Sequence, residues 1–242
     1  MTAAPLIEAK GLHVFYGESH ILHGVDFNVR AGETVGLLGR NGMGKTTLLR
    51  ALLGLTPPRR GAVRIKGGDM TGAKPYRIAR QGIAFVPEGR GIFPTLSVKE
   101  HMILAARQAT DGTRGRRAGW DLHRVLKTFP RLKRRLNLPG SLLSGGEQQM
   151  LTIGRALMAN PELIILDEAT EGLSPALTKE IWAILRKLRQ GGIACVIVDK
   201  NFAAVSALSD RCVVLVKGRV VLEGRAKDLA KKRATLHRYL GV

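Results

Sequence analysis

The sequence predicts an α/β domain built on a largely parallel core sheet, with a helical lobe inserted into it. Apolar runs of strand length recur along the 242 residues, and segments with helical spacing lie between them, which is typical of parallel sheets. A glycine-rich loop joins one such run, at residues 34–38, to a predicted helix at 45–53. The alternation stops after Pro94 and returns at Ser144, which indicates an insertion between two parts of the core.

The strands are predicted from apolar runs that end at turn-forming or polar residues. In order they span residues 6–15, 25–29, 34–38, 62–66, 83–86, 163–166 and 194–198, followed by a hairpin over 213–222 that turns at Lys217 and Gly218. The helices are predicted from apolar positions three and four residues apart and from capping residues. They span residues 45–53, a segment starting at Ser97, then 121–129, 144–159, 175–190 and a short segment starting at Asn201.

The inserted lobe is predicted to span residues 94–142. Ser97 and Glu100 have the spacing of a capping box, in which each side chain accepts a hydrogen bond from the other residue's backbone N–H at a helix start. Residues 110–119 are polar and rich in Gly and Arg, so we expect a loop there. On this division, residues 1–93 and 143–242 form the core of a single domain that covers residues 1–242.

Composition favours a folded protein that stays in the cytoplasm. Hydrophobic residues make up 45% of the chain, which is ordinary for a globular protein. No apolar run approaches the roughly 20 residues needed to span a bilayer, and residues 1–10 show no signal-peptide pattern. Cys195 and Cys212 lie in apolar runs and are expected to be buried free thiols, and no Cys/His cluster has the spacing of a zinc site.

The charge balance is strongly basic, with 39 Lys and Arg against 19 Asp and Glu, a formal net charge of +20. Such a chain is attracted to nucleic acid, anionic lipid headgroups or an acidic partner, and charge alone does not choose among them. The basic residues cluster at Arg114, Arg116 and Arg117, at Arg131, Lys133, Arg134 and Arg135, and at Lys231, Lys232 and Arg233.

The glycine-rich loop predicts a phosphate-binding loop, because it stands between a strand and a helix, as such a loop must. The residues expected to hold a nucleotide there are Gly39, Asn41, Gly42, Gly44, Lys45, Thr46 and Thr47. The glycines allow backbone N–H groups to turn inward and hold phosphate oxygens at the helix N-terminus. Lys45 is expected to reach the β- and γ-phosphates, the Thr46 hydroxyl to ligate Mg²⁺, and Thr47 to contact the α-phosphate.

Two carboxylates, Asp167 and Glu168, follow the buried strand predicted at 163–166. Ligands of parallel α/β sheets bind beyond the carboxyl ends of the strands, so both side chains are expected at the same edge as the glycine-rich loop. Asp167 is expected to hold Mg²⁺, and Glu168 to orient and polarise the attacking water. The alternative is an acidic pair that only caps the next helix, and the neighbouring phosphate-binding loop disfavours it.

A second glycine pair stands at the predicted helix start at 144, in the order Ser144, Gly145, Gly146 and Glu147. Ser144 and Glu147 form another predicted capping box, but a helix start does not by itself require two adjacent glycines. Open N–H groups at this N-terminus make a second phosphate-binding surface. One nucleotide cannot easily occupy both surfaces of one chain, so we expect this surface to serve the ATP of a partner subunit.

With these motifs the sequence resembles the ABC ATPase family over nearly its whole length. The resemblance implies a P-loop NTPase core of ABC ATPase type with an antiparallel β subdomain and an inserted helical lobe. It implies ATP and Mg²⁺ as ligands, a second ABC ATPase subunit that covers the γ-phosphate, and transmembrane permease subunits as partners. It also implies that this chain lies peripherally at the cytoplasmic side of the inner (plasma) membrane. Tyr16 stands where family members stack an aromatic ring on adenine, and the motif 171–174 follows the catalytic Glu.

Residues 86–94 and 129–133 look like the ATPase subunits of branched-chain amino-acid importers, and of related urea and amide importers. Two positions depart from the general family pattern. Glu88 stands where most members have a Gln that contacts Mg²⁺ and the attacking water, and a carboxylate can also ligate Mg²⁺. Lys200 stands where most members have a γ-phosphate-sensing His, and a Lys can pair with phosphate as a point charge. A solvated Lys at a helix start is the alternative for Lys200.

Two other functions remain open from the sequence. The first is an ABC ATPase that acts on nucleic acid or the ribosome, which the net charge suggests. No aromatic stacking platform accompanies the basic clusters and aromatics are only 5% of the chain, so we expect no nucleic-acid partner. The second is a slowly hydrolysing regulatory subunit of a heterodimer, which Lys200 favours and the intact Glu168 disfavours. Contact with the anionic membrane surface is a further explanation of the charge.

Overall fold

The computed structural model describes residues 4–107 and 119–241. The loop predicted at 110–119 falls almost wholly outside the described residues, and so does the cluster at Arg114, Arg116 and Arg117. Within the described ranges, no helix is both long enough and apolar enough to cross a bilayer.

The central sheet has the strand order β10-β9-β3-β8-β7-β6. Strands β9, β3, β8, β7 and β6 are parallel to one another, and β10 pairs with β9 antiparallel at one edge. The strands are β3 (Thr34–Leu38), β6 (Ile83–Val86), β7 (Leu163–Asp167), β8 (Ala194–Val198), β9 (Arg211–Val216) and β10 (Arg219–Arg225). All residues of β3, β7 and β8 are buried, which explains their continuous apolar runs.

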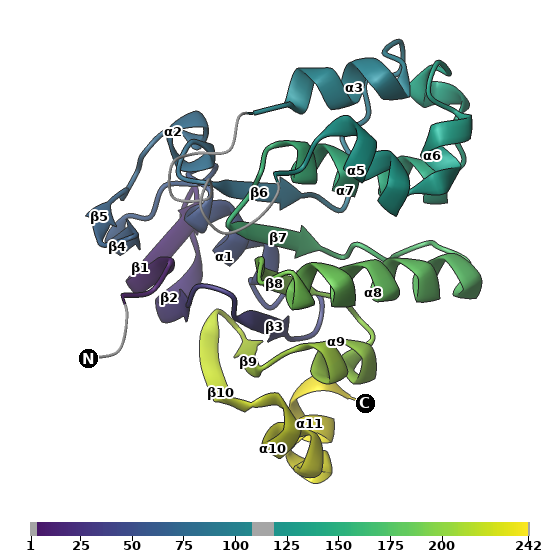
Figure 1. The fold of residues 1–242 in the computed structure, drawn as a ribbon. Helices are drawn as coiled ribbons and strands as arrows, with labels where there is room; N and C mark the ends of the chain where they lie inside the picture. Colours follow the sequence, from purple (N-terminus) through teal and green to yellow (C-terminus); the bar gives the residue numbers. More distant parts are fainter. Residues whose placement is uncertain (1–3, 108–118, 242) are drawn as a thin grey trace.

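A second sheet, entirely antiparallel, has the order β2-β1-β4-β5. Its strands are β1 (Ile7–Tyr16), β2 (Ser19–Val29), β4 (Arg60–Ile65) and β5 (Gly68–Asp69). It confirms the expected antiparallel subdomain and lies beside the central sheet, at the left of Figure 1. Strand β2 starts earlier than the predicted residue 25, because pairing with β1 continues to Ser19 although Gly24 interrupts the apolar pattern.

The helices agree with prediction where a long apolar face or a capping residue marks them. Helix α8 has the predicted bounds, and the capping boxes of Ser97 and Ser144 are both present. The helices are α1 (Lys45–Leu52), α2 (Pro75–Ala79), α3 (Val98–Ala105), α5 (Leu122–Thr128), α6 (Pro130–Arg134), α7 (Gly145–Met158), α8 (Pro175–Gln190), α9 (Phe202–Leu208), α10 (Ala226–Lys231) and α11 (Arg233–Leu240), with a 3₁₀ turn at Gly140–Leu142. Helices α2, α6, α10 and α11 were not predicted.

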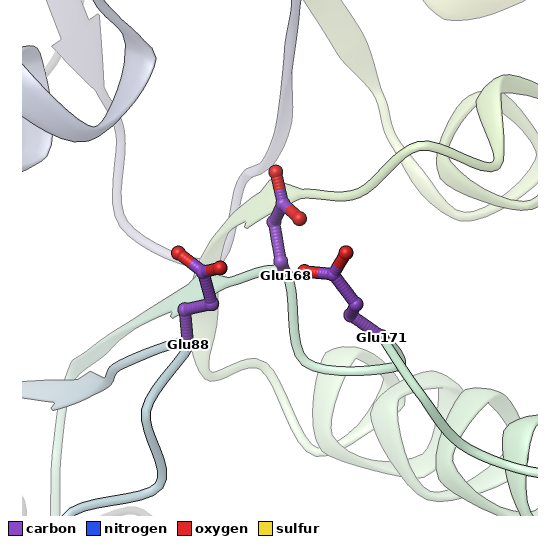
Figure 2. Close-up of side chains that lie close together, drawn as sticks. All are labelled: Glu88, Glu168 and Glu171. Atoms are coloured by element: carbon purple, nitrogen blue, oxygen red, sulfur yellow. The ribbon is translucent and has the colours of Figure 1, made fainter. Parts of the chain in front are cut away.

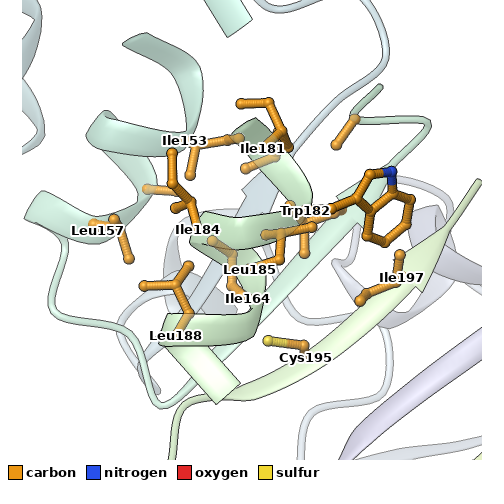
Figure 3. Close-up of a cluster of buried hydrophobic side chains, with 14 of the residues drawn as sticks. Ile153, Leu157, Ile164, Ile181, Trp182, Ile184, Leu185, Leu188, Cys195 and Ile197 are labelled. Atoms are coloured by element: carbon orange, nitrogen blue, oxygen red, sulfur yellow. The ribbon is translucent and has the colours of Figure 1, made fainter. Parts of the chain in front are cut away.

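Alternate residues of the central strands face two hydrophobic cores. Leu163 and Ile165 of β7 face a core shared with α1 and the antiparallel sheet. Ile164 faces the opposite core, where Figure 3 shows it among the side chains of α7 and α8, with Trp182 of α8 against Ile197. The two cores hold the edge of the sheet, and therefore the loops that leave it, in fixed positions.

The lobe helices α3, α5 and α6 pack on α7 at the top of Figure 1. Gly154 of α7 makes this contact close, because a Cβ there would lie 2.5 Å from Met102 Cε and 3.1 Å from Val125 Cγ1. Phe129 and Leu132 of the lobe are fully buried in the same core as α7 and α8. The boundaries at 94 and 142 stay a prediction, since this core is continuous across them.

Cys195 and Cys212 are buried free thiols, as predicted. Burial raises the pKa of Cys195 to about 12 and that of Cys212 to about 11. Both thiols are therefore protonated at neutral pH and act as packing groups, since the thiolate is the reactive form.

Candidate nucleotide-binding site

The glycine-rich loop leaves β3 and enters α1 with three glycines in the left-handed region. The φ angles are +155° at Gly39, +76° at Gly42 and +98° at Gly44. A Cβ at Gly39 would lie 2.4 Å from the Leu215 carbonyl oxygen, and one at Gly44 would lie 2.9 Å from Leu22 Cδ2. Glycine is therefore required at both positions by conformation and by space.

Gly44 is the N-cap of α1 and offers no side-chain cap. The first N–H groups of the helix consequently have no side-chain acceptor at the cap, and the positive end of the helix dipole faces out of the loop. This arrangement favours an anion, and phosphate is the anion that such loops hold.

The ammonium group of Lys45 lies over the same loop. Nζ donates hydrogen bonds to the carbonyl oxygens of Gly39 at 2.8 Å and Arg40 at 3.1 Å. Burial lowers the pKa of Lys45, and the neighbouring carboxylates of Glu168 and Asp167 oppose that shift. A largely buried cation at the mouth of a phosphate loop interacts with phosphate more strongly than a solvated one does.

Asp167 ends β7 beside this loop and is only 2% exposed. Burial raises the pKa of its carboxyl group, and a hydrogen bond from Thr46 acts in the opposite direction. Among the described residues, Asp167 Oδ1 is buried without a hydrogen-bond partner. An unsatisfied buried carboxylate oxygen beside a hydroxyl and the carboxylate of Glu88 fits a hard divalent cation, because Mg²⁺ prefers oxygen ligands.

Glu168 follows Asp167 with a φ of +51°, and its N–H donates to the Val198 carbonyl oxygen at 2.8 Å. This turn directs its side chain toward those of Glu88 and Glu171, as Figure 2 shows. One carboxylate oxygen from each of the three residues lies within 4.8 Å of the others. Burial first, and then Glu171, raise the pKa of Glu168 to about 7, so it can exchange a proton near neutral pH.

Lys200 follows β8 and reaches these carboxylates. Its Nζ forms an ion pair with Glu171 and lies 3.5 Å from Glu168 Oε2. Glu171, followed by Glu168, raises the pKa of Lys200, so the side chain is a permanent cation at neutral pH. The sequence placed Glu171 in a motif but did not indicate this contact, since the residues are 29 positions apart.

Glu88 is anchored to α7 through the residues that follow it. The guanidinium of Arg90 donates to Gln148 Oε1 at 3.3 Å, and the Arg90 carbonyl oxygen accepts from Thr152 and Arg155, each at 2.8 Å. A cavity of about 360 Å³ lies between Glu88 and the start of α7, with Ser141 and Gln148 in its lining. Glu88 thus connects the carboxylate cluster to the helix on which the lobe packs.

Tyr16 ends β1 and is 45% exposed, so part of its side chain is open to a ligand. It pairs with Ser19 across the turn into β2. Ile21 of the same strand lies against the phosphate loop, where a Cβ on Gly44 would be 3.6 Å from its Cγ2. The hairpin that carries Tyr16 therefore borders the loop that would hold the phosphates.

Ser144 and Glu147 make both hydrogen bonds of a capping box, at 3.3 Å and 2.9 Å. A Cβ at Gly146 would lie 2.3 Å from Leu177 Cδ1, and one at Gly145 would lie 2.9 Å from an Arg90 nitrogen. Packing within one chain thus gives a second reason for both glycines. Ser144 itself is exposed, and across residues 4–107 and 119–241 no hydrogen bond or ion pair joins it to the phosphate loop.

The sequence matches a known protein family and is similar to several relatives. A family model described as "ABC transporter" matches residues 22–171. The branched-chain amino acid transport ATP-binding protein BraG of Pseudomonas aeruginosa is 39% identical over 94% of this chain and 96% of its own length. The probable branched-chain amino acid transport ATP-binding protein LivF of Archaeoglobus fulgidus is 33% identical over 93% and 94%. The Nod factor export ATP-binding protein I of Rhizobium etli is 36% identical over 88% and 66%.

Solved structures agree in fold. An ATP-binding subunit of an ABC transporter aligns with a TM-score of 0.80 at 31% identity, over 95% of this chain and 93% of its own. A dimeric post-hydrolysis state of the ATP-binding cassette MJ0796, bound to ADP and Pi, aligns with a TM-score of 0.77 at 28% identity, over 91% and 98%.

Proposed function

The chain belongs to the ABC transporter family of ATP-binding proteins, which hydrolyse ATP to drive transport, and we propose that it does so as half of a nucleotide-sandwiching dimer that energises an importer. The observation that supports this best is the meeting of Lys45, Asp167 and Glu168 at one edge of the central sheet. Residues 1–242 then act as one ATPase domain, with 94–142 as the lobe that contacts the membrane subunits.

In this proposal the phosphate loop and Lys45 bind the phosphates of ATP, and Thr47 contacts the α-phosphate. Tyr16 stacks on the adenine ring, and its 45% exposed side chain supports this role. Thr46, Asp167 and Glu88 would hold Mg²⁺, which would neutralise negative charge on the phosphates. Their oxygen donors, including the unsatisfied Oδ1 of Asp167, fit that ion.

Glu168 is the proposed general base. Its raised pKa of about 7 suits a group that takes a proton from the attacking water near neutral pH. Lys200 contacts the γ-phosphate, where its ammonium pairs with an oxygen as the charge develops.

The second half of each site is proposed to come from another subunit. The helix start from Ser144 to Glu147, where Ser144 is exposed, has no hydrogen bond or ion pair with the phosphate loop of its own chain among the described residues, and in a head-to-tail dimer it covers the γ-phosphate of the other subunit. The dimeric cassette bound to ADP and Pi, similar in fold to this chain, supports such an arrangement. The second subunit is a copy of this chain or a related ATPase.

Coupling to transport follows the path from Glu88 through Arg90 to α7 and the lobe. A shift of Glu88 as the dimer closes is passed through hydrogen bonds to α7, and the buried Met102 and Val125 make the lobe follow that helix. The lobe is proposed to contact permease subunits at the cytoplasmic membrane face, where basic side chains lie favourably near anionic lipid.

The transported substrate is proposed to be a branched-chain amino acid or a similar small polar or amide solute. The names of BraG and LivF support this, and the Nod factor export relatives make an export system the competing proposal. A nucleic-acid-directed role is not favoured by these relatives. Vesicles that carry this chain assembled with its permease subunits should accumulate labelled leucine when ATP is supplied. Release of preloaded solute instead would support export.

The role of Lys200 has its own test. Lys200→Ala in the assembled transporter should lower the ATP turnover number, because the γ-phosphate loses a cationic partner. An unchanged turnover number would show that Lys200 is only a solvated side chain at a helix start.

A further inference from the structure

The Lys200 ammonium group has two carboxylate partners that come from another segment of the chain. It forms an ion pair with Glu171 and a longer one, at 3.5 Å, with Glu168. Glu168 and Glu171 lie on the turn after β7, whereas Lys200 lies on the turn after β8. The backbone fixes these turns relative to one another, because the Glu168 N–H donates to the Val198 carbonyl oxygen.

Of the two carboxylates, Glu171 makes the closer ion pair with Lys200. It is the first cause of the raised pKa of Lys200, and its own pKa is lowered by hydrogen bonds with Glu168 and Lys200. The Lys200 side chain is 55% exposed and flexible, so its position depends on these partners more than on packing.

A phosphate oxygen that binds Lys200 has to displace or share these carboxylates. A Lys ammonium is a compact point charge whose interaction with each anion weakens when it is divided among several. We infer that Glu171 is a positioning residue that sets the preference of this protein for ATP over ADP, by competing with the γ-phosphate for Lys200. The inference rests on the proposed function, in which Lys200 meets the γ-phosphate.

The competition acts on ATP and leaves ADP unaffected, because ADP has no γ-phosphate. Glu171→Gln keeps the shape of the side chain and removes its charge. The variant should bind a non-hydrolysable β,γ-imido analogue of MgATP roughly twofold to fivefold more tightly, the range expected for loss of a half-exposed ion pair. Its affinity for MgADP should not change.

A simple charge effect gives a different pattern. Removing any carboxylate near a triphosphate relieves repulsion, and this relief does not need Lys200. The double variant Glu171→Gln with Lys200→Ala separates the two explanations. If Glu171 acts through Lys200, the tighter binding of the analogue disappears when Lys200 is already absent.

The experiment is isothermal titration of the purified full-length chain with the analogue and with MgADP, for the unmodified protein, both single variants and the double variant. Glu180→Gln is the matched control, because it breaks the 3.3 Å ion pair with Arg131 on the lobe, outside the nucleotide site. Its two affinities should equal those of the unmodified chain.

Two results overturn the inference while the proposed function stands. In the first, the unmodified chain binds and hydrolyses ATP, but the Glu171→Gln variant binds the analogue with unchanged affinity. In the second, Glu171→Gln increases the affinity for the analogue by the same factor whether Lys200 is present or replaced by Ala. An unmodified chain that binds neither nucleotide would instead contradict the proposed function itself.

Discussion

The phosphate loop and the helix start at Ser144 are both helix N-termini suited to phosphate, yet they are built differently. The loop is enclosed by β2, β9 and the carboxylates, and its Lys45 is buried. Ser144 is exposed, and its hydrogen bonds are those of its own capping box. A buried site positions a ligand by itself, whereas an exposed helix end needs a second surface to exclude water. The difference supports a site completed by two chains, and the following variants test each half.

The largest expected effect is on the base. Glu168→Gln should lower ATP turnover by roughly 10²–10⁴-fold, the range for loss of general-base catalysis, while ATP binding is kept. The ATP-bound variant should accumulate as a dimer, which size-exclusion chromatography with light scattering would detect. Turnover equal to that of the unmodified chain would reject Glu168 as the base.

The next largest effect is expected from a substitution in the phosphate loop. Lys45→Ala should weaken ATP binding by about tenfold to a hundredfold, as expected for loss of hydrogen bonds to a charged group. Titration calorimetry on the isolated chain would measure it. Arg50→Ala, in the same helix but bonded to Thr56, is the control and should leave the affinity unchanged.

A smaller effect is expected at Ser144, where a substitution should change turnover but not the affinity of the single chain for ATP. Ser144→Ala should lower turnover by several-fold to about tenfold, since it removes a helix cap and the one hydrogen bond that the hydroxyl would donate to phosphate. The affinity of the single chain for ATP should stay the same, because within the described residues Ser144 has no hydrogen bond or ion pair with its own phosphate loop. Weaker ATP binding by the monomer would contradict the division into two halves.

A further effect needs no substitution, because hydrolysis should depend on pH. A base must be deprotonated to act, so a Glu168 pKa of about 7 predicts that kcat/KM for ATP rises as pH increases through neutrality and falls below it. The pH profile of hydrolysis from pH 5.5 to 8.5 measures this limb. A profile flat over that range would show that Glu168 is already ionised in the working enzyme.

The sequence predicted those parts of the fold in which a single segment carries its own signal. Strands β3, β6 and β8 and helix α8 have the predicted bounds, since each is a continuous apolar run or a long amphipathic face. The missed helices α2 and α6 are five residues each, too short for a periodic pattern. Helices α10 and α11 are rich in Lys and Arg, and their few buried residues, Ala226, Leu229 and Leu236, show their role only in the fold.

For the site, too, the sequence predicted the residues that carry a motif of their own. The structure brings Lys45, Thr46, Asp167 and Glu168 together, as their motifs indicated, because strand ends of a parallel sheet share one edge. The ion pair between Lys200 and Glu171 was not predictable, since it depends on how two turns and two flexible side chains meet. The packing of Leu177 on Gly146 was missed for the same reason.

The most direct test of the two-chain site mixes two inactive variants. Lys45→Ala keeps the Ser144 surface, and Ser144→Arg keeps the phosphate loop but blocks the surface with a bulky cation. The unmixed variants should be nearly inactive. An equimolar mixture should recover about one quarter of the unmodified ATPase rate, because half of the randomly formed dimers each contain one intact site. A mixture no more active than its components would contradict a site shared between two copies of this chain.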